Sequence, residues 1–225
     1  AIEKAKSGHP GVALGFADVV TVLWRSHLRF DTKRPDRLDR DRFVFSNGHA
    51  SALYYALLHL VGFDISLADL ASFRQLGSIT PGHPERDPAL GIDVATGPLG
   101  QGLANAVGMA MAKSFYQERR PDFPDYFVYA MVGDGCLMEG ISHEACSLAS
   151  HFSLGNLIVC WDDNGISIDG SVNGWFAEDV VKRFQAYGWQ VIDSVDGHDP
   201  EAIDLALKQA KSCRDRPSLL VCKTK

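Results

Sequence analysis

The sequence lacks paired-cysteine motifs, long apolar runs and an excess of basic residues, and each absence excludes a class of protein. Its five cysteines form no Cys-x-x-Cys pair, which disfavours a zinc site or a disulfide scaffold and predicts the reduced thiols of a cytoplasmic protein. No apolar stretch approaches the roughly 20 residues of a membrane helix, and no signal segment opens the chain. We therefore expect no membrane association.

The charge balance excludes a further class of partner. The formal net charge is −6, whereas a nucleic-acid-binding surface usually concentrates Lys and Arg on one face. A short basic cluster does occur at residues 33–42, but aspartates interleave with its arginines and lysine. This pattern favours a solvated loop over a phosphate-binding patch, so we expect no nucleic-acid partner.

The chain shows no internal boundary. No repeat, low-complexity segment or linker divides its 225 residues, and a hydrophobic content of 46% suits one large α/β domain spanning residues 1–225. The first residue is Ala1 rather than methionine, and residues 1–6 resemble the closing turn of a helix. We expect the chain to be an excerpt or one subunit of a longer enzyme.

Short, nearly continuous apolar runs recur along the chain and are typical of strands covered on both faces. They occupy residues 42–45, 126–132, 156–161, 190–192 and 218–222. Helical patterns lie between them, at residues 15–30, 50–61, 99–119, 137–152, 178–187 and 199–213, with a short helix opened by Ser66 and Asp69. The alternation predicts an α/β fold, an open, mostly parallel sheet with helices on both faces. Ligands of such sheets bind beyond the carboxyl ends of the strands.

Two polar motifs follow consecutive predicted strands. Gly133-Asp134-Gly135 comes after one apolar run, and Asn164 follows the next run, about 30 residues later. Carboxylate and amide oxygens suit a hard divalent ion such as Mg²⁺, and a diphosphate could complete its coordination. The glycines allow close approach to phosphate, and a helix from about Leu137 would point its amide dipole at the anion. Either motif alone is more typical of a tight turn, but the pair favours a metal-diphosphate site.

The histidines fall into two groups. His9, His49 and His83 each follow a glycine in a predicted loop, where the backbone can approach a ligand closely. We interpret the remaining histidines as structural or exposed, because they lie on helical patterns or lead into a capped helix. They are His27, His59, His143, His151 and His198.

The aspartate and asparagine motifs together resemble the thiamine-diphosphate motif of a broad enzyme superfamily, and a finer resemblance is to the transketolase family. Six segments resemble that family's signature, in its order. They are residues 7–11, 46–49, 80–85, 96–102, 133–143 and 162–170. The resemblance spans essentially the whole chain and implies the diphosphate-binding domain of a transketolase, with its thiamine-diphosphate-binding fold.

The resemblance also implies roles for individual residues. Asp134 and Asn164 match the family's side-chain ligands for Mg²⁺, with Ca²⁺ or Mn²⁺ as substitutes, and Ile166 matches a backbone-carbonyl ligand. The implied cofactor-binding residues are His49, Gly97, Pro98, Leu99, Gly135 and Asn164. His9 and His83 match catalytic histidines that face the reacting carbon and bind the sugar substrate. Glu139 and Glu144 match acidic residues at the subunit interface.

The implied activity is reversible transfer of a two-carbon ketol group from a ketose phosphate to an aldose phosphate, in the pentose phosphate pathway. The cofactor would supply the electron sink for carbon–carbon cleavage. Family members pair as dimers, and a pyrimidine-binding domain of the other subunit completes each site. Nothing in this chain resembles that domain, so we predict that the chain alone, whether its natural partner is a second copy or a different subunit, has no appreciable turnover.

Three alternatives compete with this interpretation. Deoxyxylulose-phosphate synthases, phosphoketolases and ketoacid dehydrogenase subunits share the metal motif, although residues 80–85 and 165–170 favour transketolase. A non-catalytic cofactor-binding module would keep the same ligands. An ordinary dinucleotide-binding domain is disfavoured, because the glycines at 97, 100 and 102 lack a preceding strand and a correctly placed acidic residue.

Overall fold

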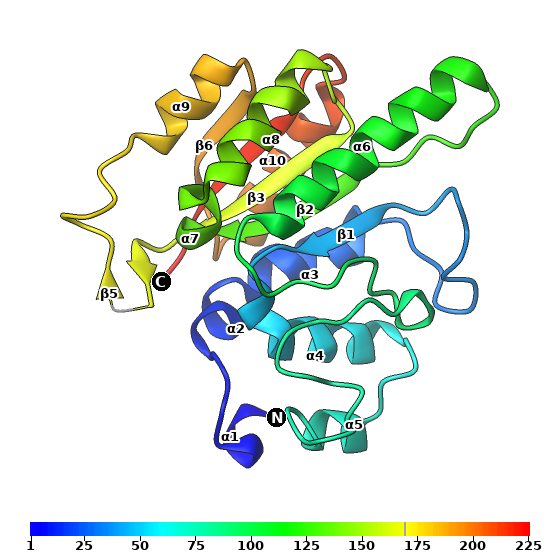
Figure 1. Cartoon of the computed structure of the whole chain (residues 1–225), viewed down its shortest axis with the longest axis vertical. Helices are drawn as coiled ribbons and strands as arrows, with labels where there is room; N and C mark the ends of the chain where they lie inside the picture. Colours follow the sequence, from blue (N-terminus) through cyan, green and yellow to red (C-terminus); the bar gives the residue numbers. More distant parts are fainter. Residues whose placement is uncertain (169) are drawn as a thin grey trace.

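The computed structural model describes residues 1–168 and 170–225, and its centre is a five-stranded sheet (Figure 1). The strands lie in the order β1 (Arg42–Phe45), β2 (Val128–Gly133), β3 (Leu157–Asp163), β7 (Ser218–Lys223) and β6 (Gln190–Asp196). Every neighbouring pair is parallel. The predicted parallel sheet is confirmed. Residue 169, part of the signature segment 162–170, lies outside the described residues.

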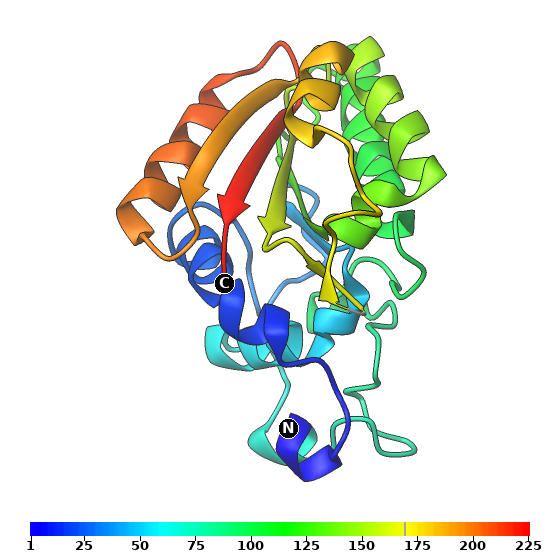
Figure 2. The same cartoon turned by 90° about the vertical axis from the view of Figure 1, so that its left-hand side faces the viewer.

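Helices cover both faces of the sheet, as predicted (Figure 2). One apolar core packs against α2 (Gly11–Gly15), α3 (Ala17–Ser26), α4 (Ser51–Val61) and α10 (Pro200–Ser212). The other packs against α6 (Gln101–Arg119), α7 (Asp134–Met138), α8 (Gly140–His151) and α9 (Val180–Tyr187). Successive side chains of a strand point to opposite faces, so Tyr129 and Met131 enter the first core while Val128, Ala130 and Val132 enter the second.

Capping residues set the helix ends that the sequence predicted. Asp199 caps α10 by accepting a hydrogen bond from the amide of Glu201 at 2.9 Å, with Pro200 in the first turn. Ser66 and Asp69 form a reciprocal capping box at α5 (Leu67–Ala71). The remaining elements are short: α1 (Ile2–Ala5), η1 (Gly48–Ala50), η2 (Pro88–Leu90), and the antiparallel hairpin of β4 (Ile166–Ser167) and β5 (Gly170–Ser171).

Two predicted helices are wrong as continuous elements. The helix predicted at 15–30 is interrupted at Phe16, where α2 gives way to α3, and it ends at Ser26. The helix predicted at 137–152 is interrupted at Glu139, whose backbone is extended (φ −69°, ψ 137°). At this break Arg183 Nη2 donates to the Leu137 carbonyl at 2.9 Å, which satisfies a helix-end acceptor from outside the helix. The helix that begins at Asp134, α7, has only five residues. That a helix dipole is aimed at an anion here stays a prediction.

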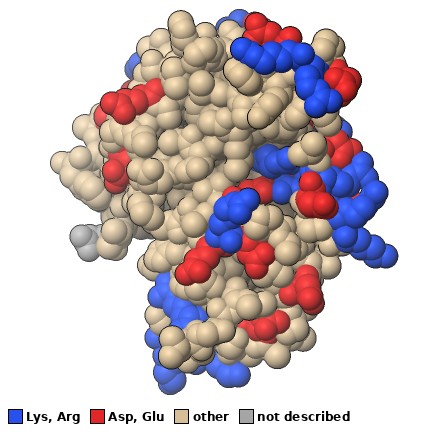
Figure 3. Space-filling model, turned by 45° about the vertical axis from the view of Figure 1, so that its right-hand side comes forward, with Lys and Arg blue, Asp and Glu red and all other residues tan. Residues whose placement is uncertain are grey.

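Within residues 1–168 and 170–225, no helix combines the length and apolar character needed to cross a membrane. The surface carries interleaved charges of both signs, and Figure 3 shows Lys and Arg side chains beside Asp and Glu on one face.

Candidate functional site

Polar residues gather where β2 and β3 end. Gly133 pairs with Asp162 across the two strands, so Asp134 and Asn164 follow neighbouring strand ends. The short helix α7, which begins at Asp134, contacts β4, which begins at Ile166. Figure 2 shows the strand arrows pointing toward the end of the molecule that holds the N-terminal segments. The structure thus brings the three predicted metal ligands to one edge of the sheet.

The carboxyl group of Asp134 is buried with one oxygen satisfied and the other without a partner. Asp134 is 3% exposed, and its Oδ1 accepts a hydrogen bond from Trp161 Nε1 at 3.1 Å. Its Oδ2 has no hydrogen-bond donor among the described residues. Burial raises the pKa of Asp134 to about 6, and the negative charge of Asp163 adds to the shift. A cation at Oδ2 would offset the cost of burying this charge.

Asn164 is held in one orientation by residues of the same turn. Its Oδ1 accepts from the Ile166 amide at 2.9 Å, and its Nδ2 donates to Asp162 Oδ2 at 3.2 Å. Asp162 is itself buried and accepts a hydrogen bond from the Thr224 hydroxyl. The Ile166 side chain is 58% exposed, and an aliphatic side chain offers no ligand atom, so this residue can contribute only its backbone.

Glycines after the ends of β1 and β2 let the loop of residues 96–99 pack tightly against them. A Cβ on Gly135 would lie 2.9 Å from Leu99 Cδ1. A Cβ on Gly48 would lie 2.7 Å from Thr96 Oγ1 and 2.8 Å from the Gly97 nitrogen. A side chain at Gly48 would therefore push the backbone of this loop away, whereas one at Gly135 would displace only the end of the Leu99 side chain. The structure thus places Gly135 beside Leu99 of the predicted cofactor loop, residues 97–99.

The three glycine-flanked histidines also converge. The ring centroids of His9 and His49 lie 5.2 Å apart. A Cβ on Gly97 would lie 3.5 Å from the His83 ring, so His83 adjoins the same loop. Burial, with smaller contributions from charge on His9 and His83, lowers the pKa of His49 to about 4. His49 is consequently neutral at pH 7, available both to donate and to accept a hydrogen bond.

Several polar residues of this region carry signals that the sequence did not reveal. Asn47 is fully buried after β1, and within the described part of the chain neither of its amide atoms has a partner. Its Nδ2 lies 4.0 Å from the position of a Cβ on Gly133. The buried Thr96 hydroxyl is similarly unpartnered within the same described ranges, and Arg74 Nη2 lies 3.4 Å from His9 Nδ1. Asn47 and Thr96 belong to the signature segments 46–49 and 96–102, but only the structure reveals that they lack hydrogen-bond partners in its described part.

The predicted interface residues Glu139 and Glu144 are exposed. Glu139 occupies the break between α7 and α8. A Cβ on Gly100 would lie 2.8 Å from the Cβ of Glu139. Glu139 therefore adjoins the loop that precedes α6. Its role, and that of Glu144, at a subunit interface stays a prediction.

Most of the other histidines have structural partners, as predicted. His27 Nε2 lies 2.8 Å from Asp204 Oδ1, and His59 Nδ1 lies 2.6 Å from the Ile65 carbonyl. The His143 ring lies between the Tyr187 hydroxyl and the Arg183 guanidinium, each at 3.0 Å. None of these contacts involves the edge where Asp134 lies.

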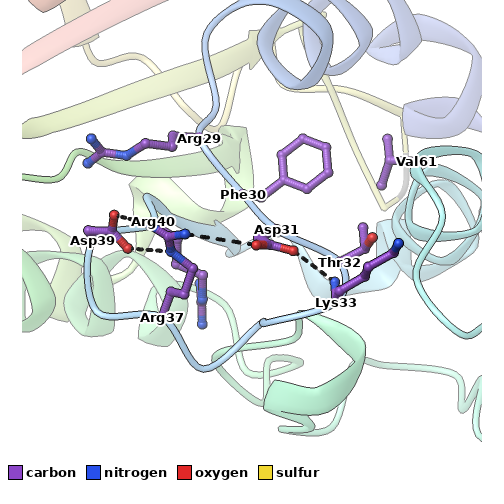
Figure 4. Close-up of a pocket in the computed structure, with 9 residues that line it drawn as sticks. All are labelled: Arg29, Phe30, Asp31, Thr32, Lys33, Arg37, Asp39, Arg40 and Val61. Carbon is purple, nitrogen blue, oxygen red and sulfur yellow. Dashed lines mark hydrogen bonds and ion pairs between the residues drawn. The ribbon is translucent and has the colours of Figure 1, made fainter.

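A separate cavity of about 430 Å³ lies beside residues 29–42 (Figure 4). Three of its lining arginines have aspartate partners: Arg37 pairs with Asp39, Arg40 pairs with Asp93, and Arg29 Nη2 lies 3.7 Å from Asp41. These arginines are already engaged, which agrees with the solvated loop that the sequence predicted.

The fold and the polar edge place the chain in the class of thiamine-diphosphate-binding domains. The family described as "Transketolase, thiamine diphosphate binding domain" matches residues 1–225. The chain is 59% identical to the plasmid-encoded transketolase of Cupriavidus necator, covering 100% of this chain and 34% of that protein. The chain thus spans about a third of the length of the curated relatives it matches.

Solved structures agree with this assignment. Transketolase from Campylobacter jejuni superposes with a TM-score of 0.95 at 54% identity, over 99% of this chain and 35% of that one. A Pichia stipitis transketolase in complex with sedoheptulose-7-phosphate gives a TM-score of 0.95 at 49% identity, over 99% and 34% of the two chains. The chain belongs to the transketolase family.

Proposed function

We propose that this chain is the diphosphate-binding domain of an active transketolase and binds thiamine diphosphate together with Mg²⁺. The observation that carries the proposal is the Oδ2 of the buried Asp134, which has no partner among residues 1–168 and 170–225 and lies beside Asn164 and Ile166 at the same sheet edge. The proposed metal ligands are the Asp134 carboxylate, the Asn164 amide oxygen and the Ile166 carbonyl. Mg²⁺, or Ca²⁺ or Mn²⁺ in its place, would take its other ligands from diphosphate oxygens and water.

The residues of the edge fit a diphosphate cofactor chemically. In the described ranges, no group of three or more His, Cys, Asp or Glu side chains is placed to hold a metal. The proposed site relies instead on Asp134 together with amide, backbone, water and diphosphate oxygens. Gly135 and Asn164 are proposed to contact the diphosphate. His49 and the loop of Gly97, Pro98 and Leu99 are proposed to contact the rings. Asn47 and Thr96 offer buried hydrogen-bonding atoms that have no partner in the part of the chain that the structure describes, and a ligand could satisfy them.

The proposed reaction is the transfer of a two-carbon ketol group from a ketose phosphate to an aldose phosphate, in the cytoplasmic pentose phosphate pathway. Thiamine diphosphate, when bound, supplies the electron sink for carbon–carbon cleavage. His9 and His83 are both exposed. They are proposed to hydrogen-bond substrate oxygens whose charge changes during the reaction. The neutral His49 is proposed to orient the cofactor without adding a positive charge beside its ring.

We further propose that residues 1–225 form one domain of a longer enzyme. A pyrimidine-binding domain and a second subunit, in a homodimer or heteromeric pair, would complete the active site, with Glu139 and Glu144 at their interface. The sugar-phosphate substrates would reach the site through the end that holds His9 and His83. Ketol transfer by residues 1–225 alone would contradict this part of the proposal.

The metal site is tested by replacing Asp134 with alanine in the complete gene product. Titration calorimetry with Mg²⁺ at saturating thiamine diphosphate should show affinity reduced by more than about 100-fold, since even outer-shell partners of metal ligands are worth about 10- to 100-fold. Asp36→Ala, the same change at an exposed aspartate of the loop, should leave the affinity unchanged. Unaltered Mg²⁺ dependence in Asp134→Ala would refute the proposed site.

The activity is tested with two substrate sets. Ketose and aldose phosphates should give ketol transfer, whereas turnover of pyruvate instead would favour a deoxyxylulose-phosphate synthase or a ketoacid dehydrogenase. Phosphate-dependent release of acetyl phosphate from a ketose phosphate would indicate a phosphoketolase. Tight cofactor binding without turnover of any set would indicate a non-catalytic module.

A further inference from the structure

The two oxygens of the Asp134 carboxylate are not equivalent. Oδ1 accepts the Trp161 Nε1 hydrogen bond at 3.1 Å, while Oδ2 finds no donor in the described ranges 1–168 and 170–225. An indole N–H is a donor only, so Trp161 can bind a carboxylate oxygen but cannot itself compete for a cation. The contact therefore assigns different functions to the two oxygens.

The position of Trp161 follows from the strand register. Trp161 in β3 lies opposite Val132 in β2, one residue before Gly133. Its ring packs in the same apolar core as Val132, Cys136 and Leu137, and it is 6% exposed. Because the ring is enclosed and its strand is paired on both sides, the direction of its N–H is fixed before any ligand binds.

We propose that Trp161 is a positioning residue for the cation site. Its N–H holds Oδ1 of Asp134 so that Oδ2 faces the cation. This inference rests on the proposed role of Asp134 as a metal ligand. Outer-shell donors fix the orientation of a ligand and tune its affinity for the metal, and losing one costs about 10- to 100-fold in metal affinity. Without the N–H, the carboxylate would be free to rotate away from the cation.

The chain provides a matched control for this contact. Trp189 is also a buried tryptophan of the same apolar core, 4% exposed, and its Nε1 donates to the Cys146 carbonyl at 2.9 Å. Trp161→Phe and Trp189→Phe therefore remove the same atoms from similar surroundings. Only the first change takes a donor away from Asp134.

The experiment measures the Mg²⁺ dissociation constant of the complete gene product by calorimetry, at saturating thiamine diphosphate. Trp161→Phe should raise the constant by about 10- to 100-fold, and Trp189→Phe should leave it within about threefold of wild type. Trp161→Tyr, which restores a hydroxyl donor, should recover part of the loss. The affinity for thiamine diphosphate at saturating Mg²⁺ should change little in every variant, since a sufficient cation concentration compensates for the weaker site.

Each possible result is decisive. An unchanged Mg²⁺ constant in Trp161→Phe, or equal losses in both phenylalanine variants, would overturn the role of Trp161 but not that of Asp134. If Asp134→Ala also binds Mg²⁺ normally, the proposed metal site itself fails.

A second measurement uses wild-type protein and so does not depend on whether a variant folds. In wild-type protein labelled with ¹⁵N, Mg²⁺ and thiamine diphosphate should shift the indole N–H resonance of Trp161 far more than that of Trp189. Equal or absent shifts would again overturn the inference.

Discussion

The loop of residues 29–42 and the carboxyl edge of the sheet treat polar groups in opposite ways. In the loop, Arg34, Arg37 and Arg40 each have an aspartate partner. Figure 4 draws Arg37 together with its partner Asp39. At the sheet edge, Asp134 and Asn47 are buried with atoms that lack partners in the described part of the chain. The loop borders a cavity of about 430 Å³, yet these three arginines already have partners. The contrast teaches that unmet hydrogen bonds mark a binding site better than hollow volume does.

The largest expected effect is a loss of stability when the loop of residues 29–42 is altered, without a loss of cofactor binding at the sheet edge. Arg40→Met leaves Asp93 without its partner, and both side chains are nearly buried, at 11% and 9% exposure. We expect the free energy of unfolding to fall by about 2–4 kcal/mol, because one charge of a buried pair stays uncompensated. Urea unfolding measures the loss. Arg34→Ala, at an exposed pair, should cost less than about 1 kcal/mol.

Cofactor affinity should not follow this loss of stability. Thiamine diphosphate should bind folded Arg40→Met as tightly as wild type. A parallel loss of affinity would mean that the loop belongs to the site, and the comparison between the two regions would fail.

A smaller effect is expected at Asn47. There a substitution should weaken cofactor binding but change stability little. Asn47→Leu replaces a buried amide that lacks partners in the described structure by an apolar group of similar size. We expect cofactor affinity to fall about 10- to 100-fold, since a hydrogen bond to a charged group is worth about 1.5–3 kcal/mol. The ligand-free protein should lose less than about 1 kcal/mol of stability, or gain some, because an unmet polar group is removed.

Asn156 provides the control for Asn47, since it is also buried, with an unpartnered Nδ2 in the described structure, but it precedes β3 at the opposite end of the sheet. Asn156→Leu should leave cofactor binding unchanged. Equal losses of cofactor affinity in both variants would show that such atoms do not mark the site.

The smallest expected effect concerns pH. Burial holds the pKa of His49 at about 4, below its ordinary value of 6.5. As pH falls below 6.5, His49 takes up a proton in the unfolded chain but stays neutral in the folded chain. Stability is therefore lost between pH 6.5 and 4. His49→Gln should lessen this loss, by about 1–2 kcal/mol at pH 5. Urea unfolding of the ligand-free protein measures it.

The window above pH 6.5 provides the control for this measurement. The stability difference between wild type and His49→Gln should stay constant from pH 7.5 to 8.5, since His49 is neutral in both states there. A difference that grows in this range, or none at pH 5, would contradict the burial of a neutral His49.

The sequence predicted the parallel sheet and both capped helices, because apolar runs and caps such as Ser66 and Asp199 are local signals. It did not predict the break at Glu139, because the donor to the Leu137 carbonyl is Arg183, far along the chain. Nor did it reveal that Asn47 lacks hydrogen-bond partners or that Trp161 contacts Asp134. These features depend on burial and on distances between segments, which periodicity cannot encode.

The antiparallel pairing of β4 with β5 has a consequence for mutational scanning. The Ile166 side chain is 58% exposed, and what this residue would contribute to the cation is its main-chain oxygen. A scan that replaces side chains one by one would score Ile166 as dispensable, because every amino acid carries the same carbonyl. Proline at Ser167, which would distort the β4–β5 pairing, or ester substitution of the peptide bond, would detect the contribution. Tolerance to substitution at this position would therefore be uninformative about its importance.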